Sequence, residues 1–86
     1  MSFVPVYQYH LGIRIDGPNK KPGDVSGIRS RDFNSKSRRN AKKIARSIFS
    51  AILESLPSGS SLMATLYKGS HGGSEVVRNF PRVFKE

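Results

Sequence analysis

The first fifteen residues hold the pattern that most restricts the fold, an alternation of apolar and polar side chains with a period of two. From position 8 the even residues are small or polar, while the odd positions carry Phe3, Pro5, Tyr7, Tyr9, Leu11, Ile13 and Ile15. Successive side chains of a β-strand point to opposite faces, so this pattern predicts a strand with one buried face. By the same parity, we expect Tyr7 and Tyr9 to pack in the core rather than to stack on unpaired bases.

A hairpin is predicted to follow this strand. Asp16-Gly17 opens a turn, and a polar, basic loop runs from Pro18 to Pro22. A second strand is then expected from about Val25 to Arg31, so that a long loop closes the hairpin.

One amphipathic helix is predicted after the hairpin, from Lys36 or Ser37 to Leu56. The residues from Asn34 to Ser37 offer several N-cap candidates, and Pro57 with the run Ser58–Ser61 ends the helix. Apolar residues recur at spacings of three and four and form a single stripe, which consists of Ala41, Ile44, Ala45, Ile48, Phe49, Ile52 and Leu56.

Two more strands are expected near the C-terminus, at Leu62–Lys68 and Glu75–Phe84, with a glycine-rich turn between them. Pro81 has no N–H to donate, which favours an edge position for the last strand. The order β-β-α-β-β predicts a small α+β domain over residues 1–86, with the helix packed on one face of an antiparallel sheet.

The size and composition restrict how such a domain is stabilised and where it works. The chain has 86 residues and no cysteine, so disulfides and thiolate metal sites cannot support a thin core. A protein partner or a homodimer would supply additional stability. We expect a cytoplasmic, reducing location and no membrane association, because no signal peptide and no apolar stretch of bilayer length is recognisable.

Positive charge is the strongest functional signal in the sequence. Lysine and arginine number 15 against six acids, which gives a net charge of +9. This excess favours a polyanionic partner, and nucleic acid, DNA or RNA, ranks first. Eight of the 15 basic residues lie between positions 29 and 46 and are the predicted nucleic-acid-binding residues, namely Arg29, Arg31, Lys36, Arg38, Arg39, Lys42, Lys43 and Arg46.

The start of the predicted helix is unusual because basic residues occupy it. Arg38 and Arg39 would stand at the positive end of the helix dipole, where acids are normally found. A phosphate bound there would relieve the repulsion and accept hydrogen bonds from free N–H groups. We therefore expect backbone contacts with little sequence preference.

The sequence has few residues that could act in catalysis, and we expect neither an enzyme nor a metal or cofactor site. His10 falls on the polar face of the first strand, where an exposed surface histidine is expected. The segment Lys68-Gly69-Ser70-His71 resembles a short element of small mRNA-cleaving toxins with a double-stranded-RNA-binding-like fold. That resemblance implies an alternative function, a ribonuclease in which His71 does acid–base work.

A second resemblance covers residues 7–49. This part of the chain is similar to the arm-type DNA-binding domains of tyrosine recombinases, which place a sheet on DNA. The similarity lies in the order of two strands, the segment from Arg31 to Lys36 and a helix. The same outline resembles small phage-encoded, anti-CRISPR-like inhibitors of bacterial defence complexes. This resemblance implies the first alternative to a nucleic-acid-binding module, an inhibitor that docks on a nucleoprotein complex, and the ribonuclease is the second alternative.

Overall fold

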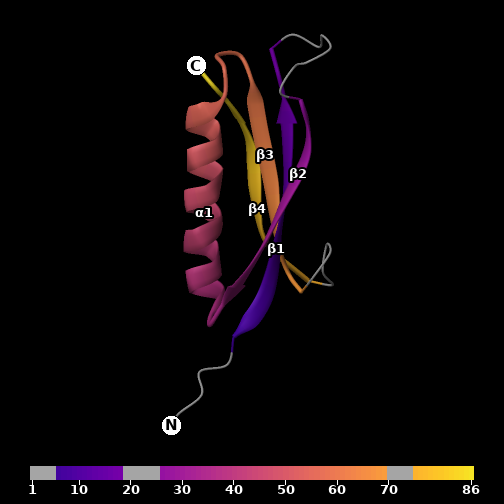
Figure 1. The fold of residues 1–86 in the computed structure, drawn as a ribbon, viewed down its shortest axis with the longest axis vertical. Helices are drawn as coiled ribbons and strands as arrows, with labels where there is room; N and C mark the ends of the chain where they lie inside the picture. The colour runs from indigo at the N-terminus through magenta and orange to yellow at the C-terminus, as the bar shows by residue number, and fades with distance from the viewer. Residues whose placement is uncertain (1–5, 19–25, 70–74) are drawn as a thin grey trace.

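Four strands form one antiparallel sheet, and a single helix covers one of its faces (Figure 1). This arrangement comes from a computed structural model that describes residues 6–18, 26–69 and 75–86. The elements are β1 (Tyr7–Asp16), β2 (Gly27–Ser35), α1 (Arg38–Ser55), β3 (Ser61–Lys68) and β4 (Glu75–Phe84). The predicted α+β class and the β-β-α-β-β order are confirmed.

The strand order β2-β1-β3-β4 places the two hairpins side by side, with β1 and β3 in the centre. In the register of this central pair, Leu11 lies opposite Leu66 and Ile13 opposite Ala64. The odd residues of β1 therefore share the helix-facing side with the apolar residues of β3. The edge position expected for the strand with Pro81 is confirmed, since β4 is an outer strand.

The predicted end of β2 was wrong. The strand was expected to stop at Arg31, but it continues to Ser35, which pairs with Tyr7. Ser35 is buried, and its hydroxyl oxygen accepts a hydrogen bond from the Asn40 side-chain amide at 3.0 Å. Pairing with the whole length of β1 thus outweighs the local turn preference of asparagine and serine.

Ser37 is the N-cap of α1, and its hydroxyl accepts a hydrogen bond from the N–H of Asn40 at 3.1 Å. Two small buried residues, Ala41 and Ala45, bring the helix close to the sheet. Further along, the ring of Phe49 stacks on that of Phe80 from β4 with centroids 5.3 Å apart. These contacts orient the apolar stripe toward the sheet, as the periodicity predicts.

Within residues 6–18, 26–69 and 75–86, no helix lies over the other face of the sheet (Figure 1). No helix among the described residues is long and apolar enough to cross a membrane.

Candidate nucleic-acid interface

Five of the predicted binding residues lie on α1, and the packing of the helix decides which way they point. Phe49 faces β4 through its stack on Phe80, and Arg38 forms an ion pair with Glu75 at the start of β4. Lys42 and Arg46 follow Arg38 at intervals of four residues, so they form one ridge with it along the β4 side of the helix.

Arg78 of β4 extends this ridge onto the sheet. It pairs with the buried Leu66 and therefore projects on the helix-facing side. Its guanidinium carbon lies 5.6 Å from the centre of the Phe80 ring. Arg78 was not among the predicted binding residues, because its proximity to α1 depends on strand pairing that no local motif signals.

The remaining helix residues of the predicted set, Arg39 and Lys43, are exposed and point away from the sheet. Lys36, also exposed, comes two residues before the helix begins. We call the set of seven the basic helix surface, and it comprises Lys36, Arg38, Arg39, Lys42, Lys43, Arg46 and Arg78.

At the helix N-terminus the structure reveals a carboxylate that the sequence reasoning missed. The first turn of α1 contains no acid, yet the side chain of Glu75 accepts a hydrogen bond from the Arg38 guanidinium. This hydrogen bond, together with the positive charge, lowers the pKa of Glu75, and the same contact raises the pKa of Arg38. The repulsion expected at Arg38 is thus partly relieved within the protein.

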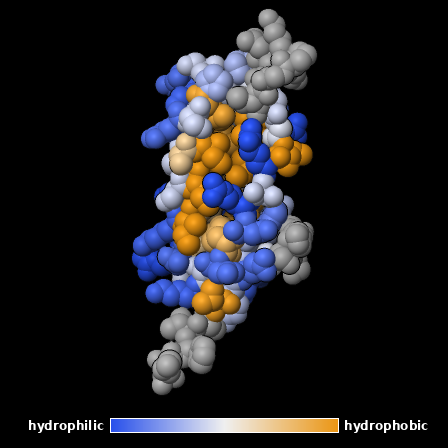
Figure 2. Space-filling model, viewed as in Figure 1, coloured by the Kyte–Doolittle hydropathy of each residue, from blue (hydrophilic) through white to orange (hydrophobic). Residues whose placement is uncertain are grey.

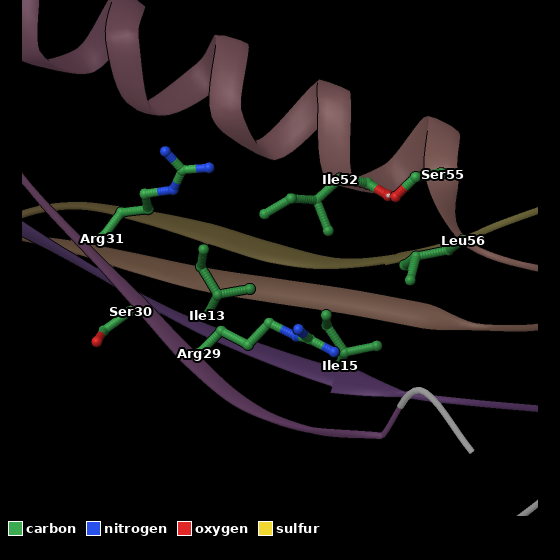
Figure 3. A pocket seen from close by; sticks show the side chains of 8 residues that line it. All are labelled: Ile13, Ile15, Arg29, Ser30, Arg31, Ile52, Ser55 and Leu56. Carbon is green, nitrogen blue, oxygen red and sulfur yellow. Dashed lines mark hydrogen bonds between the residues drawn. The ribbon is translucent and has the colours of Figure 1, made fainter. Parts of the chain in front are cut away.

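The other two predicted residues, Arg29 and Arg31, are on the opposite flank of α1. They belong to β2 and line a groove between this strand and the C-terminal half of the helix, where Ile52 also lies (Figure 3). The eight predicted residues therefore do not form one surface, because the helix separates the β2 pair from the ridge beside β4.

The open face of the sheet carries balanced charges. The carboxylate of Asp16 lies 3.5 Å from a guanidinium nitrogen of Arg14 and 3.6 Å from one of Arg82. On the same face, Asp32 contacts His10 across the β1–β2 pair. The unbalanced positive charge of the described residues is therefore concentrated on the helix side of the molecule.

The expectation of a freely exposed His10 was wrong. Its side chain is only 14% exposed, and Nδ1 lies 2.6 Å from a carboxylate oxygen of Asp32, its cross-strand neighbour. The imidazole also lies against the ring of Tyr67, with centroids 6.2 Å apart. His71 falls outside the described residues, and within the described ones no three potential metal-ligating side chains come together.

The two N-terminal tyrosines differ in burial. Tyr9 is buried, as predicted, and its ring stacks on that of Phe33 with centroids 5.9 Å apart. Tyr7, which was also expected in the core, is 44% exposed, and the Lys68 ammonium lies 4.4 Å from the centre of its ring. Tyr7 is the first residue of β1, and Figure 1 shows this end of β1 extending past the start of α1.

Comparison with protein-family models, with curated proteins and with solved structures gives no match. The functional conclusion therefore rests on the residues of this chain.

Proposed function

We propose that this protein is a non-enzymatic nucleic-acid-binding module that holds phosphates on the basic helix surface. The observation that carries the proposal is the charge composition of one continuous surface. The stretch from Lys36 to Arg46 contains six basic residues and no acid, and Arg78 adds a seventh positive charge from β4. Glu75 pairs with one of the seven, and such one-signed surfaces attract polyanions.

The dimensions of the ridge suit a nucleic-acid backbone. From Arg38 to Arg46 the ridge covers eight residue-to-residue steps of helix, which is a length of about 12 Å at 1.5 Å per residue. Along one DNA strand, phosphates recur about every 3.4 Å of helix axis while the strand winds around that axis, so the three cations can contact a few neighbouring phosphates. The side chains are long and cationic, which supports contacts with backbone phosphates.

The charge distribution favours the helix over the sheet as the docking face. Docking by the open sheet, as the resemblance to recombinase arm domains implies, would place Asp16 and Asp32 against phosphates. Each of these carboxylates is already in contact with a basic group of the sheet, so that face offers a polyanion little net attraction.

Two matched double variants separate these faces. Lys42→Gln/Arg46→Gln removes two charges from the ridge, and Arg14→Gln/Arg82→Gln removes two from the open sheet. Affinity for labelled duplex DNA, hairpin RNA and single strands is measured by fluorescence anisotropy. We expect the ridge variant to lose at least about tenfold in affinity and the sheet variant less than about threefold.

Equal losses in the two variants would mean that net charge alone governs binding, and a larger loss in the sheet variant would move the interface to the open face. The sheet variant also leaves the Asp16 carboxylate without its two partners. This makes the control stringent, because the extra negative charge adds to any effect of the lost arginines.

The absence of catalysis is part of the proposal and has its own assay. The protein is incubated with structured and unstructured RNA, and we expect the RNA to remain intact. If the protein cleaves RNA and the His71→Ala variant does not, the protein is a ribonuclease that uses His71, and the proposal is wrong. Cleavage that disappears in His10→Ala would place the chemistry at the contact between His10 and Asp32 instead.

A further inference from the structure

β2 is an edge strand, and both its outer edge and most of its side chains are exposed. Among the described residues it pairs only with β1, so its outer edge presents main-chain N–H and C=O groups. Its first six residues are all exposed, and Ile28, at 85%, is the most exposed large apolar side chain described. An exposed apolar residue on an open strand edge is typical of a surface that pairs with another strand.

A groove runs beside this strand on the helix side. Its volume is about 530 Å³, and Figure 3 shows side chains from α1, β1 and β2 around it. Figure 2 shows an apolar band along this part of the molecule, with hydrophilic residues beside and over it. The apolar lining comes from Ile13, Ile15, Ile52 and Leu56.

Two arginines of β2 define the charge of the groove. Arg29 pairs with Ile13 and Arg31 with Leu11, so both project on the helix-facing side. No carboxylate of the described residues forms an ion pair with either guanidinium. Their Cα atoms are two strand positions apart, about 7 Å, which is also the spacing of alternate residues in any strand laid beside them.

Gly27 lies on β2 two positions before Arg29, just outside the residues that line the groove. It lies opposite Ile15, and a Cβ atom at Gly27 would meet none of the described atoms within 4 Å. An apolar side chain on a neighbouring strand could therefore lie over Gly27, on the side of the sheet where Ile15 is buried.

We propose that β2 is the docking site for an acidic β-strand of a partner protein. The added strand forms main-chain hydrogen bonds with the outer edge of β2. It places an apolar side chain over Gly27 and carboxylates opposite Arg29 and Arg31, where guanidinium groups bind carboxylates in a bidentate manner. The partner segment therefore reads apolar-x-acidic-x-acidic, in either chain direction.

Other occupants fit these features less well. Two β2 strands paired antiparallel around Ser30 would place arginine opposite arginine, and like charges directly opposite each other destabilise a sheet. A nucleic acid has no main chain that can pair with a strand edge, and it would leave Ile28 uncovered. The proposal is independent of the nucleic-acid function, because the basic helix surface lies on the other side of α1.

The test uses a synthetic peptide of about ten residues, which is the length of a strand. Threonine fills the x positions and the positions that flank the motif, leucine the apolar one and glutamate the two acidic ones. Binding is followed by anisotropy and by backbone amide shifts at about 0.15 M salt, where distant charges are screened. We expect amide shifts in β2 and saturable binding.

Two control peptides separate strand pairing from charge attraction. One carries the same residues with the glutamates in adjacent positions, which sends them to opposite faces of the strand. The other is N-methylated at the main-chain amides that would face β2. We expect neither control to bind, and equal binding of the N-methylated peptide would overturn the proposal.

Protein variants locate the site. Arg29→Gln/Arg31→Gln should weaken peptide binding by at least about tenfold, because two charge-assisted contacts are lost. Lys42→Gln/Arg46→Gln, with the same loss of charge, should change it by less than about threefold. Arg29→Lys/Arg31→Lys keeps the charge but not the bidentate geometry, and we expect intermediate affinity.

Unchanged peptide binding in the folded Arg29→Gln/Arg31→Gln variant would refute the docking site. So would a dimer that sedimentation detects and that forms through β2. Displacement of the peptide by an oligonucleotide would also refute it. Circular dichroism of each variant shows whether it is folded. The lysine variant keeps the test valid if the glutamine variant does not fold.

Discussion

The stack of Phe49 on Phe80 sets the rotation of α1 about its axis, and this rotation decides which basic residues share a surface. Phe49 is 8% exposed, and its ring lies 5.3 Å from that of Phe80 at an angle of 22°. Truncating a buried phenylalanine to alanine costs about 3–5 kcal/mol. At about 0.05–0.15 kcal/mol per residue, 86 residues give a total stability of about 4–13 kcal/mol. Phe49→Ala should therefore remove a quarter or more of the free energy of unfolding.

Urea unfolding followed by circular dichroism measures this loss as a lower midpoint at an unchanged m-value. A double-mutant cycle with Phe80→Ala should give a coupling energy of about 0.5–1.5 kcal/mol for the ring pair. Ser50→Ala, at an exposed helix position, is the control and should stay within about 0.5 kcal/mol of the parent. If Phe49→Ala does not fold, Phe49→Leu provides a milder truncation. A loss below about 1 kcal/mol in Phe49→Ala, or zero coupling, would refute the helix orientation and with it the ridge beside β4.

Three further predictions concern charge. The logarithm of the affinity for duplex DNA should fall linearly with the logarithm of the salt concentration. Lys42→Gln/Arg46→Gln should reduce the magnitude of this slope by about 1.8, at about 0.9 per phosphate contact. An affinity that does not change with salt would contradict a phosphate interface. Arg39→Glu should raise the free energy of unfolding by about 0.3–1 kcal/mol because an acid suits the helix N-terminus. Arg38→Glu should give no gain in stability, because the new carboxylate would lie beside that of Glu75. Equal gains at both sites would exclude the ion pair between Arg38 and Glu75. The pKa of Glu75 is lowered in the folded state, so the stability that it contributes is present above the ordinary glutamate pKa of about 4.3 and is lost as the pH falls through the folded pKa. Thermal melts between neutral and acidic pH should therefore show a smaller acid-induced decrease in Tm for Glu75→Gln, and an identical decrease would mean that the carboxylate has no partner.

The features that could be predicted from the sequence are those with a local, periodic signal. The alternation in β1 identifies its buried face, because Leu11, Ile13 and Ile15 all lie on the same side of the strand and can be buried together. The three-and-four spacing in α1 identifies Ala41, Ala45 and Phe49 in the same way. Both signals arise from side chains that all make the same kind of contact, so each residue strengthens the prediction made from the others.

The features that were missed depend on contacts between distant segments. Glu75 reaches Arg38 because β4 runs beside the helix, and the two residues are 37 positions apart. The contact of His10 with Asp32 depends on the hairpin register, and the predicted end of β2 at Arg31 excluded it. Strand pairing creates such neighbours, and no short-range pattern encodes the register of a hairpin with a long loop.

The division of the predicted binding residues has the same origin, and it gives the two flanks of α1 different chemistry. The β4 side carries a row of lysines and arginines along the helix, which suits a diffuse row of phosphates. The β2 side has two arginines above an apolar groove and beside an open strand edge, which suits carboxylates held in a defined register. A helix with its side chains is about 10–12 Å thick, whereas charges are screened over about 8 Å at physiological salt. The two surfaces are therefore far enough apart to be occupied together, so nucleic acid on one flank should leave the affinity of the other for an acidic strand nearly unchanged.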